Sequence, residues 1–390
     1  MYDFSSKMTA PLPRTAQRLT FIDIFRGLAA LWMIETHAVN EFLSAEYKRG
    51  GLFQLLNISN GFVAVAFIFC AGAGFWLALE RKHDDYRKFG PAMRSYLLRL
   101  LFILGIAYIL QTPKFSLART LDSTPDDLLR LLQCNVLHLI VFSSLAALFA
   151  AVLAKKTEVL RVVYGALAVV MLLAAPTMRS FDPFAVMPVF PATLFAGLPV
   201  SLFPLFPWSC YFFAGAAATA FFRRAENKRR LAITLLWASA ASVAVIFFVK
   251  DGLKIYSVQQ HWWAYSPEHT LFRIAGAVFL FSGLFLLEPR LGGRTSRALT
   301  IAGQESLYIY VLQGVIIYSA VGKLKLTDIV GQHLSPPEVV LLILAIAGFC
   351  LATAALWRRF KTTRPVAARR SARIVVAVML ALFVVFPADF

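Results

Sequence analysis

Eleven apolar runs, each about as long as a helix that crosses a bilayer, limit what this chain can fold into more than any other feature. A bilayer offers no water to backbone groups, so a spanning segment must be a helix or part of a closed barrel, and runs of this length are typical of helices. Only 15% of the residues are charged, against about 25% in soluble domains. The sequence therefore predicts an all-α, polytopic integral membrane protein with about eleven transmembrane helices, at residues 27–44, 59–79, 95–112, 131–154, 159–175, 207–222, 231–249, 271–287, 298–318, 338–357 and 374–388.

The net charge of +18 would suit nucleic-acid binding, so the distribution of the basic residues has to be considered. If the N-terminus is cytoplasmic and the segments alternate, 26 of the 39 basic residues lie inside, nine lie outside and four lie in or beside spans. This asymmetry follows the positive-inside rule. We therefore expect no nucleic-acid partner, a multi-pass protein of the plasma (inner) membrane, a cytoplasmic N-terminus and an outer C-terminus.

Two domains are predicted, a cytoplasmic N-terminal segment over residues 1–20 and one transmembrane domain over residues 21–390. The longest connection, at about 176–206, lies outside and is rich in proline and apolar residues. An apolar loop of this kind is expected to fold back onto the helices.

The first span carries ionisable residues, which are expensive inside a membrane and usually functional. Arg26 and His37 are eleven residues apart, so they share one helix face about 16 Å apart along the axis. Asp23 precedes Arg26 by one turn, and Glu41 follows His37 by one turn. This pattern predicts an anion clamp at the cytoplasmic edge and a histidine base, oriented by a carboxylate, deeper in the membrane. A topology anchor explains Arg26 equally well, and a polar helix contact is the simpler alternative for His37.

Four segments carry a resemblance to known families. The run Phe21–Ala29 resembles the opening helix of the heparan-α-glucosaminide N-acetyltransferase family, and the Arg26-x(10)-His37 spacing resembles the signature of the acyltransferase-three family. Both belong to a superfamily of transmembrane acyltransferases, which take acyl groups from cytosolic acyl-coenzyme A to sugars or lipids. The other segments that resemble these families are 67–72 followed by Arg81-Lys82, 203–208, and 306–313. The 203–208 segment favours the heparan-type family.

The resemblance implies an acyl-coenzyme A-dependent membrane acetyltransferase or acyltransferase with a glycan or sugar-lipid acceptor reached from the outer side. Combined with the residue pattern, it leads us to predict His37 as the general base, Glu41 as its orienting carboxylate, and Arg26, Arg94 and Arg99 as donor phosphate ligands. Acyl-coenzyme A is the co-substrate, and no further cofactor and no metal is expected. The candidate acceptor pocket comprises Asn135, His138, Trp208, Glu305, Tyr308 and Gln313.

The chain departs from the acyltransferase-three pattern at two places. Arg94 and Arg99 are spaced more widely than the usual arginine pair, and Gln313 stands where that family often has histidine. These departures leave the acceptor, O- or N-acylation and the oligomeric state open, together with the choice between direct transfer and an acyl-histidine intermediate. The alternative function is a proton-coupled secondary transporter with Glu35, His37 and Glu41 as a proton relay, although the chain shows no internal repeat or paired interrupted helices.

Overall fold

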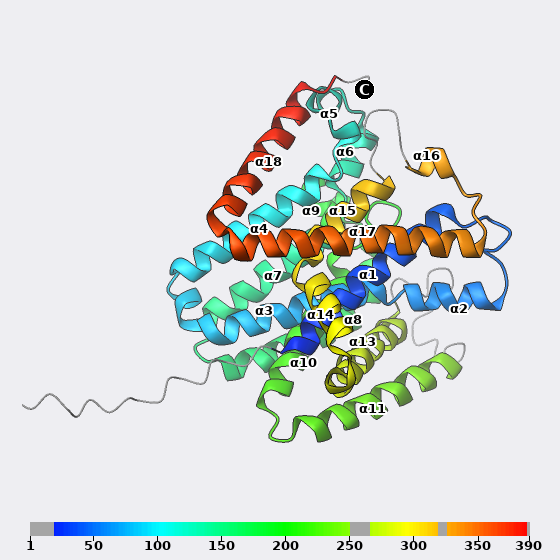
Figure 1. Cartoon of the computed structure of the whole chain (residues 1–390). Helices are drawn as coiled ribbons and strands as arrows, with labels where there is room; N and C mark the ends of the chain where they lie inside the picture. Colours follow the sequence, from blue (N-terminus) through cyan, green and yellow to red (C-terminus); the bar gives the residue numbers. More distant parts are fainter. Residues whose placement is uncertain (1–18, 250–265, 319–325, 388–390) are drawn as a thin grey trace, which may run out of the picture.

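The computed structural model describes residues 19–249, 266–318 and 326–387, and helices dominate this part of the chain (Figure 1). It contains no named strand, only an isolated bridge between Leu43 and Leu334. The predicted all-α fold is confirmed. In chain order the helices are α1 (Thr20–Phe42), α2 (Gly51–Asn60), α3 (Val63–Arg87), α4 (Pro91–Ile109), α5 (Leu117–Leu121), α6 (Pro125–Leu132), α7 (Val136–Leu153), α8 (Thr157–Ser180), α9 (Val189–Phe195), α10 (Leu205–Arg224), α11 (Lys228–Val249), α13 (Pro267–Leu287), α14 (Gly293–Gln304), α15 (Ser306–Tyr318), α16 (Leu326–Val330), α17 (Pro336–Thr363) and α18 (Pro365–Val385).

Eight helical segments in the described part of the chain are long and apolar enough to cross a membrane, so the protein is a multi-pass membrane protein. They correspond to eight of the eleven predicted spans and comprise α2 with α3, α4, α7, α8, α10, α11, α13 and α17. The other three predicted spans are not among these eight segments, and each has an identifiable reason. The first, α1, carries several charged residues, the run 298–318 is broken at Glu305, and α18 begins with three arginines. Of the predicted N-terminal segment, residues 1–18 lie outside the described residues.

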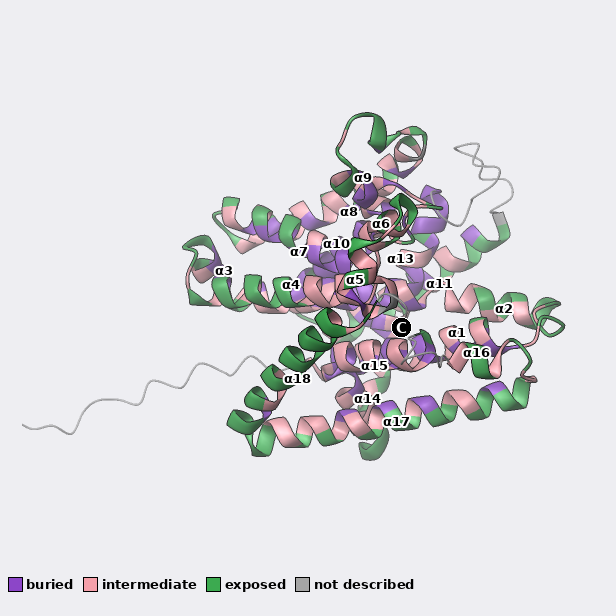
Figure 2. Ribbon diagram, turned by 90° about the horizontal axis from the view of Figure 1, so that it is seen from above, coloured by how far each residue is buried: buried purple, intermediate pink, exposed green. Residues whose placement is uncertain are grey.

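Helix α1 lies in the middle of the molecule because small residues let its neighbours approach closely. A Cβ atom added at Gly27 would lie 2.0 Å from the carbonyl oxygen of Leu299 on α14, and one added at Gly303 would lie 1.8 Å from the carbonyl oxygen of Asp23. Crossings of this kind are typical of helices packed inside membranes. Burial is concentrated around α10, whereas α18 at the edge is largely exposed and buries only Ala368 (Figure 2). The exposed apolar face of α18 suits contact with lipid.

The two ends of α1 define two sides of the protein. At its start, the ring of Phe21 packs against Phe222 and Phe285, at the far ends of α10 and α13, with centroids 5.6 and 5.3 Å apart. At its end, the carbonyl of Phe42 accepts a hydrogen bond from the Leu334 amide just before α17. We call these the Thr20 side and the Phe42 side. The first residues of α10, α13 and α17 therefore lie on the Phe42 side.

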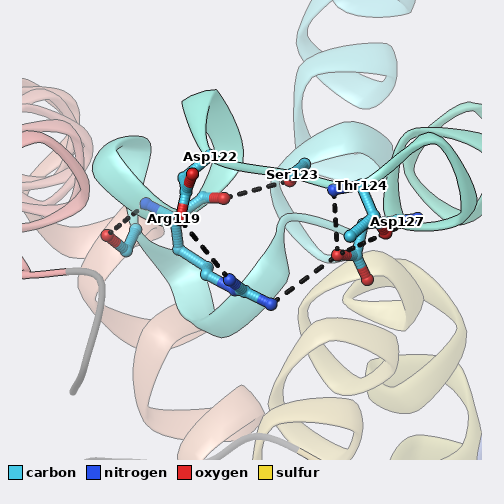
Figure 3. Close-up of polar contacts among 6 residues, drawn as sticks. Arg119, Asp122, Ser123, Thr124 and Asp127 are labelled. Atoms are coloured by element: carbon cyan, nitrogen blue, oxygen red, sulfur yellow. Dashed lines mark hydrogen bonds and ion pairs between the residues drawn. The ribbon is translucent and has the colours of Figure 1, made fainter.

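The connection between α4 and α7 is held by local polar contacts (Figure 3). Thr124 caps α6 reciprocally with Asp127, and the guanidinium of Arg119 lies 3.7 Å from the Asp127 carboxylate. The hydrogen bonds from Thr124, with the nearby arginine, lower the pKa of Asp127. The connection also meets the end of the chain, where the Ser116 hydroxyl donates to the Phe386 carbonyl at 2.6 Å.

The 176–206 connection folds back onto the helices, as its apolar composition predicted. The Thr193 hydroxyl donates to the Leu132 carbonyl at 2.9 Å, and the Cys134 amide donates to the Ser201 hydroxyl at 2.8 Å. Ser201 in turn donates to the Thr193 carbonyl at 2.7 Å. This segment closes over the start of α7 on the Phe42 side.

Candidate active site

His37 lies in the Phe42 half of α1 with its ring held in one tautomer. Its Nδ1 lies 2.8 Å from Oε1 of Gln313 on α15. The Gln313 amide nitrogen donates to the Tyr310 carbonyl at 3.1 Å, so the amide oxygen must be the atom that faces the histidine. An oxygen can only accept, so Nδ1 is the donor, and in the neutral imidazole the lone pair is on Nε2. His37 is therefore arranged as a general base that acts through Nε2.

Gln313 occupies the orienting position that the helix spacing assigned to Glu41. Glu41 instead shares a hydrogen bond with the hydroxyl of Tyr318, whose ring packs edge-on against His37 with centroids 5.2 Å apart. The spacing argument placed Glu41 on the correct face of α1, but it could not include a side chain from a helix 276 residues away. In the acceptor pocket prediction Gln313 was a substrate contact, whereas in the structure it is a buried partner of the candidate base.

A second polar group on α1 faces away from His37. The Glu35 carboxylate accepts a hydrogen bond from the Asn60 amide at 3.4 Å, and the Asn60 oxygen accepts one from the Trp32 indole at 3.2 Å. Asn60 is the last residue of α2, so this contact joins α1 to the beginning of the second predicted span. Sequence reasoning did not single out Asn60, because an asparagine at a helix end is usually a local cap.

Arg26, on the Thr20 side, is already engaged by protein groups. Its guanidinium lies 2.8 Å from the Asp23 carboxylate, and Gln304 donates to the other Asp23 oxygen at 3.3 Å. The Nε atom is buried without a partner. A Cβ atom added at Gly74 on α3 would be 3.9 Å from the guanidinium. An incoming phosphate would therefore meet an arginine whose charge is partly neutralised by Asp23, not a free cation.

The two arginines on α4 are exposed. Arg94 lies in the first turn and Arg99 about one turn deeper, and in the described part of the chain neither side chain makes a hydrogen bond or ion pair. Both face away from the buried side of α4, which is formed by Met93, Leu100 and Ala107. Their role as donor ligands stays a prediction.

A groove lined by basic residues lies on the Thr20 side. The sequence analysis explained these basic residues only by membrane topology. The groove has a volume of about 860 Å³ between α14 and α17, and its basic lining residues are Arg297, Arg358 and Arg359. Next to it, Lys361 forms an ion pair of 2.6 Å with Glu305 at the break between α14 and α15. The groove brings three guanidinium groups close to the helix that contacts Asp23.

The predicted acceptor pocket separates into two places. Asn135 and His138 form the capping box of α7, so their shared face has a local structural cause. The ring of Tyr108 packs 4.4 Å from the His138 ring, and the His138 Nε2 is buried without a partner. Phe203 links this end of α7 to Trp208, because its amide donates to the Cys134 carbonyl and its ring contacts the indole.

Glu305 and Tyr308 lie elsewhere. Glu305 is buried and paired with Lys361 of α17, towards the Thr20 side. Tyr308 packs in the apolar cluster that joins α1, α15 and α17. The sequence analysis predicted one unbroken helix over 298–318 with a continuous polar stripe. In the structure the helix is broken at Glu305, where α14 ends and α15 begins, so the stripe is not continuous.

A family model described as heparan-alpha-glucosaminide N-acetyltransferase, catalytic, matches residues 18–261. The chain belongs to this family. The match covers α1 with Arg26 and His37 and also the segments 67–82 and 203–208, whereas the segment 306–313 lies beyond it. No curated protein matches the chain. The protein is thus a membrane acetyltransferase of this family, and the partner of its candidate base comes from outside the matched region.

Proposed function

We propose that this acetyltransferase moves an acetyl group across the membrane, from acetyl-coenzyme A on the cytoplasmic side to a glycan or sugar-lipid acceptor on the outer side. The observation that carries the proposal is the contact of the His37 Nδ1 with the Gln313 oxygen, which leaves Nε2 as the nitrogen that can act as a base in the neutral ring. The positive-inside distribution of basic residues makes the Thr20 side cytoplasmic. The membrane would be the plasma (inner) membrane.

The reaction needs a base near the acceptor. His37 Nε2 takes the proton of an acceptor hydroxyl or amine as that oxygen or nitrogen attacks the thioester carbonyl carbon. The carbon–sulfur bond then breaks, and the imidazolium returns the proton to the departing coenzyme A sulfur. The new bond is an ester or an amide. Arg26 and His37 are about 16 Å apart along α1, so the extended arm of the donor would run along this helix.

The phosphates of the donor would lie on the Thr20 side. Arg26, Arg94 and Arg99 are the ligands predicted from their positions in the sequence. The groove formed with Arg297, Arg358 and Arg359 offers a second set of guanidinium groups on the same side, and guanidinium binds phosphate through paired hydrogen bonds. Substitution of each set shows which one is used.

The test of the base uses purified full-length protein with radiolabelled acetyl-coenzyme A and a panel of glycan acceptors. His37→Ala should retain acetyl-coenzyme A affinity and lose transfer by about 10²–10⁴-fold, the usual contribution of general base catalysis. His333→Ala, outside the helices, is the matched control. If the wild-type protein does not bind acetyl-coenzyme A at millimolar concentration and shows proton-dependent flux, the transporter alternative replaces this proposal.

The test of the donor site compares Arg99→Ala and Arg358→Ala with Arg230→Ala, an exposed arginine at the start of α11. Losing a charge-assisted contact costs about 1.5–3 kcal/mol, or about ten- to a hundredfold in affinity. Loss in only one of the first two variants identifies the phosphate ligand set. Unchanged affinity in both would assign these arginines to membrane topology alone.

A further inference from the structure

The groove between α14 and α17 has a basic end and an apolar end. The basic end lies at the start of α14 and the end of α17, where Arg297, Arg358 and Arg359 line it. The remaining lining residues, most of which are apolar and lie nearer the membrane interior, are Thr300, Ile301, Ala352, Ala355, Leu356 and Thr362. At about 860 Å³ the groove is as large as a small-molecule binding site, for which about 300–1,000 Å³ is usual. Its lining fits a ligand with an anionic head and an apolar body.

The protein does not neutralise the charge of the three arginines at the basic end. In the described part of the chain, none of their guanidinium groups forms an ion pair or a hydrogen bond, and no carboxylate lines the groove. By contrast, the cleft of about 640 Å³ beside the end of α3, on the same side of the protein, is lined by four acidic residues as well as by basic ones. Adjacent guanidinium groups without acidic partners favour an anion from outside the chain.

The apolar end of the groove continues along one face of α17. Leu356 lines the groove, and Phe349 and Leu341 precede it in the sequence at intervals of seven and eight residues. These intervals keep the three side chains on one helix face, and each side chain is more than half exposed. Helix α17 lies at the edge of the molecule, where this face meets lipid (Figure 2). Leu356 and Phe349 are about 10 Å apart along the axis, so an acyl chain that starts in the groove can lie along this face.

The groove does not lead toward the candidate base. Its lining residues belong to α14 and α17, whereas His37 is on α1. Helix α14 packs so closely against α1 at Gly27 and Gly303 that no ligand can pass between the two backbones there. An acyl-coenzyme A with its phosphates in the groove would have to go round α14 to reach His37. This arrangement suits a lipid better than the donor.

We propose that the groove binds an anionic phospholipid of the cytoplasmic leaflet, with its phosphate on the three arginines and one acyl chain along Leu356 and Phe349. Anionic lipids are abundant in that leaflet, and basic pockets between membrane helices bind their headgroups. The inference goes beyond the proposed function, because the lipid is not a reactant. Bound lipid would hold α14 against α17, next to the ion pair of Lys361 with Glu305, and so stabilise the protein.

The experiment counts lipid molecules bound to the full-length protein by native mass spectrometry. The probes are dioleoyl phosphatidylglycerol, the zwitterionic dioleoyl phosphatidylcholine, and glycerol phosphate, which carries the phosphate without the chains. Phosphatidylglycerol should occupy one site at least about tenfold more tightly than phosphatidylcholine, the factor that one charge-assisted contact supplies. Equal affinities for the two lipids, or displacement of phosphatidylglycerol by an equal concentration of glycerol phosphate, would overturn the inference.

Two kinds of variant test the two ends of the groove. The double variant Arg358→Gln with Arg359→Gln should lose the preference for phosphatidylglycerol. Its control is Arg229→Gln with Arg230→Gln, an exposed arginine pair at the start of α11 on the same side, which should keep the preference. Ala355→Phe retains every charge but places a ring in the groove, so it should also weaken binding. Equal losses in the two double variants would assign the preference to the general basicity of this side and refute the site.

Acetyl-coenzyme A is the other source of phosphate for this groove, and a competition separates the two ligands. Saturating acetyl-coenzyme A should leave the phosphatidylglycerol bound, and displacement of the lipid would assign the groove to the donor instead. Thermal unfolding is measured on the same samples. Phosphatidylglycerol should raise the unfolding temperature of the wild type, and the double variant at Arg358 and Arg359 should match the wild type in phosphatidylcholine but show no such rise.

Discussion

Replacing Gln313 with leucine should slow acetyl transfer without weakening acetyl-coenzyme A binding. Gln313 is buried, and its amide oxygen is the hydrogen-bond partner of Nδ1 in the His37 ring. Leucine has a similar volume but no acceptor, so the proton can move to Nε2 and the ring loses its fixed orientation. The tautomer with the proton on Nε2 cannot accept a proton from the substrate.

The expected size of the effect follows from this single hydrogen bond. A buried hydrogen bond contributes about 0.5–1.5 kcal/mol net, which corresponds to roughly a 2- to 13-fold change in the population of the competent tautomer. The loss in kcat should therefore be far smaller than the roughly 10²–10⁴-fold loss expected for His37→Ala. Gln313→Glu retains an acceptor oxygen and should recover most of the rate.

The assay follows acetyl-coenzyme A consumption at saturating donor, with transfer to an acceptor and slow hydrolysis measured in parallel. The double variant His37→Ala with Gln313→Leu should be no slower than His37→Ala alone, since Gln313 acts only through the histidine. Losses that multiply in the double variant, or an unchanged kcat in Gln313→Leu, would refute the assignment of Gln313 as the residue that positions His37.

Three further predictions concern packing, topology and pH. Gly303→Ala should lower the free energy of unfolding of the detergent-solubilised protein by about 1–3 kcal/mol, because the new methyl group would meet backbone atoms of α1. Gly314 has open space around it, so Gly314→Ala should have little effect in the same thermal unfolding measurement. Cysteines placed at Lys88 and Lys48 should be labelled from opposite sides of the membrane, cytoplasmic and outer respectively, and labelling of both from one side would contradict the topology. The pKa of Asp127 is lowered in the folded protein, so its stabilising contribution is present above its unfolded pKa of about 4 and is lost as the pH falls further. The protection of α6 amides against hydrogen exchange, relative to the intrinsic exchange rate at each pH, should therefore decrease on acidification in the wild type, and Asp127→Asn should remove that dependence.

The locally encoded properties of this protein could be predicted from its sequence. Apolar run length identified the eight helical segments that are long and apolar enough to cross a membrane, because a bilayer imposes a minimum length on every crossing helix. The pairing of Asp23 with Arg26 follows from one turn of α1, and both the resemblance of the Phe21–Ala29 run and the R-x(10)-H spacing of Arg26 and His37 lie within that same helix. Family membership and the candidate base were therefore accessible from short stretches of residues.

Only the tertiary structure decided how distant segments meet at the site. Gln313 and His37 are 276 residues apart, and no periodicity in either helix indicates that their side chains face each other. The break at Glu305 divides one predicted span into α14 and α15, and the length of an apolar run does not locate a break within it. Helix periodicity is a property of neighbours along the chain, whereas the partner of a side chain depends on which helices pack together.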